Sequence, residues 1–339
     1  MKILKKEFLN LFLRPIIQYS YLAFFIFVGF KFFDFYKWAI SGQGIPPTRP
    51  SAVEAFLPLS ALMGAKRLIL TGQYDEIHPA GLTIFLALIF SSFLFRKGFC
   101  GWVCPIGTIS NLFEILGKRL KIAFSLPRWL DLPLLSLKYI LLGFFLYIIL
   151  IQMNIIQIEQ FIFSPYNIAA DAKMLRFFLS PSKTTLIVII SLIGFSLAVR
   201  NCWCRYLCPY GLFLGFFAFL GPVQIKREEK FCINCKKCER ICPSQIKITS
   251  YKVVRNFECI GCTECISICK ERCLRVKVLP PLFSIIIDKG IALPKFVIPV
   301  GVITTIFIFW IVAKTTGHWE SHLSANVFAK MYNIVLGQN

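Results

Sequence analysis

The chain has 339 residues, enough for two globular domains, but its composition is not that of a purely soluble protein. Hydrophobic residues make up 57% and charged residues 16%, whereas soluble domains have roughly 45–50% and about 25%. This profile excludes intrinsic disorder and collagen-like or low-complexity architectures. The 38 Lys and Arg against 17 Asp and Glu give a formal net charge of +21. Such an excess raises the question of whether the basic residues lie on one side of a membrane.

Five apolar stretches approach the length of a membrane-spanning helix, which is about 20 residues. In chain order they cover residues 15–33, 79–95, 133–153, 184–199 and 296–313. The second and fourth are short, but Arg96, Lys183 and Arg200 border them and can extend to the lipid headgroups. A very hydrophobic soluble helical protein would not need such basic borders. We therefore predict a mainly α, polytopic membrane helical bundle of about five transmembrane helices.

Lys and Arg concentrate before the first stretch, in residues 96–132 and in residues 200–290. Because cytoplasmic loops carry the excess of positive charge, we predict that these regions are cytoplasmic and the C-terminus is outside. We expect the N-terminal stretch to be a retained anchor, since no small-residue cleavage site follows it. The basic excess then reflects topology and attraction to anionic membrane lipid, and we predict no nucleic-acid partner. The expected location is the cytoplasmic (inner) membrane of a prokaryote.

An internal repeat relates residues 96–107 to residues 200–211 with a constant offset of 104 residues. Each copy holds a Cys-x3-Cys-Pro motif, and the motif cysteines are Cys100, Cys104, Cys204 and Cys208. Each copy also leads into a short apolar segment, 108–116 or 212–220, which we expect to be an interfacial or re-entrant helix. The repeat predicts a membrane core of two similar halves.

The strongest signal is a doubled cysteine run with the spacing C-x2-C-x2-C-x3-C. The first run is Cys232, Cys235, Cys238 and Cys242, and the second is Cys259, Cys262, Cys265 and Cys269. Pro243 follows the first run, whereas Lys270 follows the second. Thiolates at this spacing hold [4Fe–4S] clusters, and the fourth cysteine of each run ligates the other cluster. We predict Cys232, Cys235, Cys238 and Cys269 on one cluster and Cys259, Cys262, Cys265 and Cys242 on the other.

Other uses of these cysteines fit less well. Disulfides are disfavoured in a cytoplasmic region because thiols stay reduced there, and structural zinc prefers two C-x2-C pairs with a longer gap. Cys273 remains outside the two runs. We interpret it as a buried free thiol, the alternative being that it replaces Cys269 as a ligand.

The Cys-x3-Cys-Pro pairs are less decisive. Cysteines at i and i+4 share one face of a helix, so Cys100 with Cys104, and Cys204 with Cys208, can each bind a metal jointly. Together the pairs supply four sulfurs for a third metal or cluster site. The alternatives are a redox-active dithiol or a structural role. Cys202 has no counterpart in the first copy, and no role is assigned to it.

With these motifs, residues 15–275 resemble the membrane-bound polyferredoxins of the NapH, NosR and CcoG type. The resemblance implies several membrane helices and a cytoplasmic bacterial-type 2[4Fe–4S] ferredoxin domain with the eight run cysteines as ligands. It also implies electron transfer between the quinone pool and a respiratory or assembly partner. The fifth helix and the outer tail are extra to the core of NapH-like members.

These inferences combine into one domain scheme. We predict a membrane domain with both Cys-x3-Cys-Pro repeats over residues 1–225, a small α+β ferredoxin domain over 226–285, and a fifth membrane helix with an outer tail over 286–339. The predicted function is electron transfer through two [4Fe–4S] clusters between quinol or quinone and a respiratory reductase or other electron-transfer protein. The alternative is a copper reductase, an assembly factor or a redox regulator of a respiratory enzyme. A role as the subunit of a quinol dehydrogenase-type enzyme stays open.

The three histidines, His78, His318 and His322, all fall on the predicted outer face. His318 and His322 have the i,i+4 spacing of a helical metal site, the alternative being an exposed amphipathic tail. His78 could accept a proton from quinol, the alternative being an ordinary interfacial histidine. We favour the second reading for both.

Overall fold

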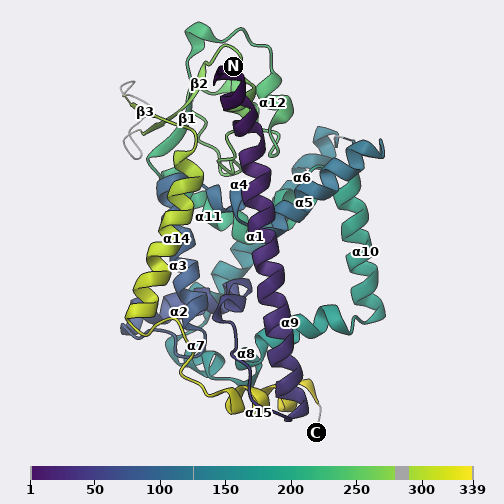
Figure 1. Cartoon of the computed structure of the whole chain (residues 1–339), viewed down its shortest axis with the longest axis vertical. Coiled ribbons are helices and arrows are strands. Elements are labelled where there is room, and N and C mark those ends of the chain that lie inside the picture. The colour runs from purple at the N-terminus through teal and green to yellow at the C-terminus, as the bar shows by residue number, and fades with distance from the viewer. Residues whose placement is uncertain (1, 125, 279–289, 338–339) are drawn as a thin grey trace. The chain divides into compact units, whose positions relative to one another are not determined.

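A computed structural model describes residues 2–124, 126–278 and 290–337 of the chain. The described part is mainly helical, with one small sheet (Figure 1). It divides into two compact units, and the division passes through several of the long helices. The cysteine unit consists of Met1–Leu22, Leu88–Leu142 and Leu192–Thr305 and holds all fourteen cysteines. The histidine unit consists of Ala23–Ala87, Gly143–Ser191 and Ile306–Asn339 and holds all three histidines.

Three stretches of helix are long and apolar enough to cross a membrane. They are Leu13–Ser41 within α1 (Lys2–Ser41), Trp129–Gln152, formed by α6 (Arg128–Leu146) and the π-helical turn η2 (Tyr147–Gln152), and α14 (Val297–Thr315). A fourth is possible if α9 (Ala170–Leu179) and α10 (Lys183–Ala198), bent by 79°, form one broken span. These apolar helices indicate a membrane protein.

The remaining two predicted spans are shorter helices. The stretch 79–95 forms α3 (Pro79–Phe95), which has 17 residues, and the stretch 184–199 lies largely on α10, which has 16. The helices therefore form where the apolar stretches predict them, but only three to four meet the criteria of length and hydropathy for a span. The orientation in the membrane stays a prediction.

The 104-residue repeat is visible in the helices. The pair α3 and α10, and the pair α5 (Pro105–Arg119) and α11 (Pro209–Leu220), each begin 104 residues apart, as the sequence repeat does. The predicted apolar segments 108–116 and 212–220 thus lie on helices. Between the two helices of each copy the chain makes a short turn of helix, α4 (Gly98–Trp102) or the π-helical η3 (Trp203–Leu207).

The region of the doubled cysteine run is a small α+β fold within the cysteine unit. Its antiparallel sheet has the order β1 (Val223–Arg227), β2 (Leu274–Val278), β3 (Ile291–Leu293), with Val223 opposite Val278. Two short helices, α12 (Lys237–Ile241) and α13 (Glu264–Ile268), each begin between the second and third cysteines of a run. A buried core joins the sheet to the cysteines; its members are Ile225, Cys242, Ile246, Ile248, Val254, Cys259, Cys265, Cys273 and Leu274. A small sheet thus accompanies the cysteine cluster, as the α+β part of the predicted fold class requires, whereas the domain bounds 226–285 stay a prediction.

The histidine unit has its own apolar core. Beside the ends of longer helices it contains η1 (Ser51–Phe56), α2 (Pro58–Thr71), α7 (Ile155–Ile162), α8 (Pro165–Ile168) and α15 (Ala325–Leu336). Phe35 and Tyr332 meet edge to face with ring centroids 6.2 Å apart, and Ile158 and Ile162 are fully buried in the same cluster. Such aromatic packing stabilises the unit without any cysteine.

Candidate iron–sulfur centres

The two cysteine runs share one backbone conformation. In the first run Asn234 and Lys236 have positive φ angles of 54° and 55°, and in the second Gly261 and Thr263 have 61° and 60°. The paired residues are 27 positions apart, the same offset that relates the cysteines of the two runs. Residues of left-handed conformation next to right-handed ones turn successive backbone N–H groups toward one side, which forms a concave site for an anionic group. We call Cys232–Cys238 the first loop and Cys259–Cys265 the second loop.

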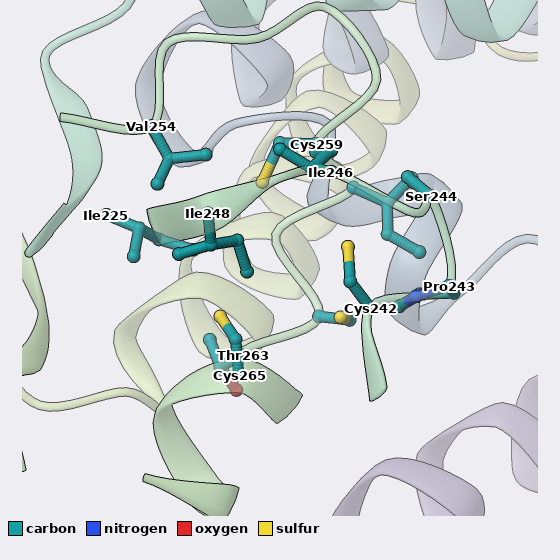
Figure 2. Close-up of a pocket in the computed structure, with 12 residues that line it drawn as sticks. Ile225, Cys242, Pro243, Ser244, Ile246, Ile248, Val254, Cys259, Thr263 and Cys265 are labelled. Atoms are coloured by element: carbon teal, nitrogen blue, oxygen red, sulfur yellow. The ribbon is translucent and has the colours of Figure 1, made fainter. Parts of the chain in front are cut away.

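The four cysteines predicted to share the second cluster border one cavity. Its lining includes Cys259, Cys262 and Cys265 of the second loop and Cys242, the last cysteine of the first run. In Figure 2 the sulfurs of Cys242, Cys259 and Cys265 turn toward a common space. The crossed arrangement predicted from the spacing therefore corresponds to a set of four sulfurs around one cavity.

The other predicted set is more open. Cys232, Cys238 and Cys269 are half-buried against the same apolar core, and Cys235 is exposed. Cys273 is 4% exposed, and its Sγ lies 3.3 Å from the Sγ of Cys269. Cys273 is thus a buried thiol, as expected, and it borders this set of ligands. None of the fourteen cysteines forms a disulfide.

Burial disfavours the thiolate form of several of these cysteines. Burial raises the pKa of Cys262 to about 12, and that of Cys242 to about 11. Burial likewise holds the pKa of Cys265 well above its usual value. These thiols therefore stay protonated near neutral pH unless a positive group stabilises the thiolate, and iron supplies that charge when a cluster binds.

The second loop docks against helical parts of the cysteine unit. A Cβ added to Gly101 in the first Cys-x3-Cys-Pro motif would lie 2.5 Å from the carbonyl oxygen of Ile260, so the backbones touch there. The neighbouring Trp102 donates a hydrogen bond through Nε1 to the carbonyl of Gly261 at 3.0 Å. Lys97 donates to the carbonyl of Phe257 at 2.8 Å. These contacts tie the motif to the backbone that surrounds the cavity.

Two ion pairs extend the same contact. Glu258 pairs with Lys138 of α6, with 2.6 Å between Oε2 and Nζ, and Glu264 pairs with Arg14 of α1. The lysine side chain is 1% exposed, so a good geometry is required to offset its loss of hydration. Although burial opposes ionisation of Glu258, Lys97 and Lys138 lower the pKa of its carboxyl.

The second repeat, with its Cys-x3-Cys-Pro motif, contacts the backbone around Cys242. Arg205 donates to the carbonyl of Ser244 at 2.5 Å, and Asn201 donates to the carbonyl of Pro243 at 3.3 Å. Arg200 donates to the carbonyl of Ile241 at 3.0 Å. Both repeats therefore hold the backbone that carries Cys242 or Cys259–Cys265, whereas the first loop receives no such contact from them among the described residues.

A second cavity lies where the two repeats meet the ferredoxin region. One cysteine of each pair, Cys100 and Cys204, borders it, together with the cationic side chains of Arg14, Lys97 and Arg205. Pro243, Ser244 and Ile260 border both this cavity and the one bounded by Cys242, Cys259, Cys262 and Cys265. The two cavities are thus neighbours that share part of their lining.

The remaining motif cysteines cap helices. Cys104 and Cys208 occupy the N-cap positions of α5 and α11, and the Gly211 amide donates to the sulfur of Cys208 at 3.3 Å. Burial raises the pKa of Cys104 to about 11, partly offset by backbone N–H groups, and the charge of Cys208 raises it further. The charges of Cys104 and Cys208 both raise the pKa of Cys100, so the sulfurs of the two pairs lie close enough to interact electrostatically.

The described residues contain no group of three or more His, Cys, Asp or Glu side chains arranged to hold a single metal ion. Cysteines around a cubane bind separate iron atoms and need not converge on one point.

The histidine unit contains a buried ionic network that the sequence did not reveal. Arg49 bridges two fully buried carboxylates, Glu54 at 2.7 Å and Asp171 at 2.6 Å. His78 is 1% exposed, with Nδ1 3.3 Å from Glu54. Burial lowers the pKa of His78, but Glu54 more than compensates and raises it above its usual value. His78, which we expected at the membrane interface, is therefore a buried member of a charge network. The sequence did not reveal this because Glu54 and Asp171 are 24 and 93 residues away from it.

The other two histidines do not form a helical pair. The chain between α14 and α15 has no helix at residues 318–322, so the i,i+4 spacing does not place His318 and His322 on one helical face. His318 packs edge to face on Tyr74 with ring centroids 4.5 Å apart, and His322 is exposed.

Comparisons with protein families agree with the two kinds of cysteine motif. A family described as "4Fe-4S binding domain" matches residues 77–123 and 183–227, which contain the two Cys-x3-Cys-Pro motifs. A family described as "4Fe-4S dicluster domain" matches residues 224–270, which contain the doubled run.

Several curated proteins are similar over most of the chain. The protein YccM of Escherichia coli (strain K12), whose name provisionally assigns it to electron transport, is 36% identical over 94% of this chain and 89% of its own length. An uncharacterized protein of Methanocaldococcus jannaschii, MJ0749, is 32% identical over 63% of this chain and 82% of its own length. The ferredoxin-type protein NapH of Haemophilus influenzae is 27% identical over 77% of this chain and 87% of its own length. No solved structure matches the chain significantly.

Proposed function

Because the chain belongs to the membrane-bound 4Fe–4S polyferredoxin family that includes YccM and NapH, we propose that it moves electrons between the quinone pool and a respiratory partner. The coarser statement, a ferredoxin-type electron transport protein with 4Fe–4S binding domains, follows from the family alone. The observation that carries the finer proposal is the contact of both Cys-x3-Cys-Pro motifs with the backbone around Cys242, Cys259, Cys262 and Cys265.

We assign the cluster ligands as the spacing predicts. Cys232, Cys235, Cys238 and Cys269 form the distal set, and Cys242, Cys259, Cys262 and Cys265 form the proximal set, nearer the membrane helices. The fit rests on the donor type, the cavity and the concave loops with positive φ. When bound, each cluster supplies a reversible one-electron carrier.

A third centre at Cys100, Cys104, Cys204 and Cys208 is supported by three observations. The four thiols lie in one electrostatic neighbourhood, two of them border a cavity, and the other two cap helices whose N-termini favour a thiolate. Lys97, Arg14 and Arg205 border the same cavity and offset the negative charge of bound thiolates.

The chain's own residues then define an order of sites. Cys235 of the distal set is exposed, and the proximal set borders the first cavity. Cys100 and Cys204 of the cysteine pairs border the second cavity, which shares Pro243, Ser244 and Ile260 with the first. The backbone contacts of Trp102, Arg205 and Lys97 hold the second and third positions together. This order suits a protein that connects a membrane substrate with a partner in the aqueous phase. By the positive-inside rule that partner lies in the cytoplasm, and the membrane is the inner membrane of a prokaryote.

The proposal is tested with the full-length protein purified anaerobically in lipid nanodiscs. We expect about eight irons per chain for two clusters, with more if the cysteine pairs bind a third, and reduction of the clusters by a short-chain quinol. Two interacting [4Fe–4S] signals in electron paramagnetic resonance (EPR) spectra would support the assignment. Zinc or no metal in the intact protein would contradict it, and clusters that quinol cannot reduce would contradict the quinone link alone.

One observation favours a second function, metal handling during assembly of a respiratory enzyme. Cys100 and Cys204 border a cavity of their own and are soft ligands suited to Cu(I) as well as to iron–sulfur clusters. In that case the protein would reduce or deliver copper, and the pairs would bind the cargo. Stoichiometric Cu(I) binding that disappears in the Cys100→Ser, Cys204→Ser double variant, with the iron content unchanged, would select this function.

A further inference from the structure

The residues beside the first cysteine of each run have different surroundings in the two copies. They are exposed in the first copy, whereas in the second copy they contact other parts of the cysteine unit. Phe231 and Ile233 flank Cys232 and are 60% and 68% exposed. The residues at the equivalent positions are Glu258 and Ile260. The first of these pairs with Lys138, and the second contacts Gly101 through its carbonyl oxygen. The same face of the repeated fold is therefore covered in one copy and open in the other.

The charge of this face is reversed between the copies. Across the 27-residue offset, Lys230, Lys236 and Lys237 of the first copy correspond to Phe257, Thr263 and Glu264 of the second. All three lysines are exposed, and none makes an ion pair within the described part of the chain. Phe257, in contrast, stacks on Phe219 with ring centroids 4.6 Å apart, and Thr263 is 3% exposed.

The docked copy shows how the fold recognises its neighbour. Two acidic side chains of the second copy, Glu258 and Glu264, pair with two basic side chains, Lys138 and Arg14. An interface of this kind brings patches of opposite potential together, with apolar contact between them. The open copy carries exposed apolar side chains between exposed lysines. Its neighbour should therefore be acidic where the neighbour of the docked copy is basic.

Basic residues elsewhere strengthen the same surface. The turn after α13 carries the exposed Lys270 and Arg272, and it meets the first run because Cys273 contacts Cys269 and interacts with Cys232. Exposed Arg240 donates to the carbonyl of Cys235 at 3.3 Å. Arg240 thus places positive charge beside the most exposed of the proposed ligands, whereas the exposed Glu271 between Lys270 and Arg272 offsets part of the charge of that turn.

We propose that the first loop is the docking surface for an acidic, soluble, one-electron redox protein. This inference rests on the proposed function and adds the class of partner and the site of contact. The step is an outer-sphere transfer: one electron lost at the distal centre of this protein reduces the oxidised centre of the partner, or the reverse, and no bond forms or breaks. Exposure of Cys235 allows the two centres to approach without opening the fold.

An anionic lipid surface would also attract lysines, but two features favour a protein partner. Exposed lysines directly follow the proposed redox ligand Cys235 in the sequence, and the exposed apolar Phe231 and Ile233 lie between Lys230 and Lys236. A redox protein uses both the short approach to the ligand and the apolar contact, whereas a lipid headgroup uses neither.

The experiment compares two probe proteins of opposite charge. The holoprotein in nanodiscs of neutral lipid is reduced, freed of excess reductant and mixed in a stopped-flow instrument with an acidic blue-copper protein or with a basic c-type cytochrome. The test variant is Lys230→Glu, Lys237→Glu, which leaves the left-handed Lys236 of the cluster-binding loop unchanged. The matched control is Lys314→Glu, Lys330→Glu, which makes the same charge change at exposed lysines of the histidine unit. Affinity for the acidic probe is measured separately with the oxidised proteins.

We expect the native protein to reduce the acidic probe with a second-order rate constant that falls as salt rises. The test variant should lose roughly tenfold in that rate and a similar factor in affinity, while its rate with the basic cytochrome rises. The control variant should behave as the native protein does. Iron content and EPR spectra equal to those of the native protein establish that the test variant is folded and loaded.

Three results would overturn the inference. One is a loaded test variant that reduces the acidic probe at the native rate, and another is an equal loss in the control variant. The third is an effect of the lysines that is seen only in nanodiscs of anionic lipid, which would assign them to the membrane surface. None of these results affects the proposed function, which instead fails if the native protein lacks reducible clusters.

Discussion

The two halves of the ferredoxin region have one backbone and two environments. Both cysteine loops turn through left-handed residues at the same positions, and each leads into a short helix of five residues. Yet the second loop is held by Trp102, Lys97 and Arg14, whereas Cys235 of the first loop is exposed. The cysteine spacing therefore determines that a cluster can bind, and the residues between the cysteines determine what the cluster faces.

The comparison bears on the crossed ligand set that we propose. Cys242 belongs to the first run in sequence, but it is 8% exposed and borders the cavity of the second loop. Asn201 and Arg205 hold the two residues after it. The membrane repeats thus contact the proximal set from both runs, and the distal set is left to the solvent side.

The largest effect should come from breaking this crossed set. We expect the Cys242→Ser variant to lose the same cluster as Cys265→Ser, with about four irons removed from each. Quinol reduction of the distal cluster should also stop, because the proximal position is the contact with the membrane repeats. Iron analysis and EPR spectra of the two variants, with Cys235→Ser as the control that loses the distal cluster only, provide the measurement. If Cys242→Ser has the spectrum of Cys235→Ser, the crossed assignment is wrong.

The next largest effect should come from the buried ion pair that docks the second loop. Replacing Lys138 by Ala leaves the carboxylate of Glu258 in a partly buried place with one cation fewer. Removing one partner of such a pair costs roughly 3–5 kcal/mol, reduced here because Lys97 still lowers the pKa of Glu258. The midpoint of thermal loss of the cluster's visible absorbance should fall by several degrees.

A double variant tests whether the loss comes from the unpaired carboxylate. Lys138→Met with Glu258→Gln removes both charges and should recover part of the midpoint, because no charge is then left unpaired. Lys118→Ala, at an exposed lysine that pairs with Glu114 in the same unit, is the control and should change the midpoint little. If the single and double variants lower the midpoint equally, the loss comes from the packing of the lysine side chain and not from the unpaired charge of Glu258.

Much of this arrangement could be predicted from the sequence, but only where residues act through local spacing. The doubled run, the 104-residue repeat, the helix 79–95 and a short helix over 108–116 follow from cysteine spacing and apolar runs. Which cluster lies near the membrane helices depends on Gly101, Trp102 and Lys97, which are about 160 residues from the carbonyls they contact. No local pattern reports such a contact.

The sequence pattern predicts the short lengths of two apolar helices, but not the buried charges. Apolar runs predict five spans, two of them short, and α3 and α10 are 17 and 16 residues long. Arg49, Glu54 and Asp171 look like loop charges in the sequence, and only tertiary packing brings them together around His78. The cysteines of one run are brought together by the conformation of a single loop, so their spacing can be read from the sequence. The charge network forms only when the whole unit is folded.

A smaller effect should come from the point of closest backbone approach. The Gly101→Ala substitution adds a Cβ only 2.5 Å from the carbonyl oxygen of Ile260, so one backbone must shift. Overpacking of this kind costs about 1–3 kcal/mol, and we expect the EPR signal of the proximal cluster to broaden or shift while the distal signal stays unchanged. Gly143→Ala, where a Cβ meets nothing within 4 Å, is the control. A change of the distal signal alone would contradict the assignment of proximal and distal sets.

The smallest expected effect compares the two left-handed positions directly. Gly261 and Asn234 occupy equivalent positions of the two loops, with φ angles of 61° and 54°. The Gly261→Ala variant should lose roughly 1–2 kcal/mol because a left-handed alanine is strained. Its Cβ would also contact Ile298 and Arg96 at 3.4 and 3.5 Å.

The Asn234→Gly variant should change the stability by less than about 0.5 kcal/mol, because glycine adopts the same φ and the neighbouring surface is open. Thermal loss of visible absorbance measures both variants, and Asn234→Ala separates backbone strain from contact with neighbours. If Asn234→Ala costs as much as Gly261→Ala, strain alone accounts for both losses. In that case the docked surroundings of the second loop contribute nothing to its preference for glycine, and the difference between the two loops is confined to charge.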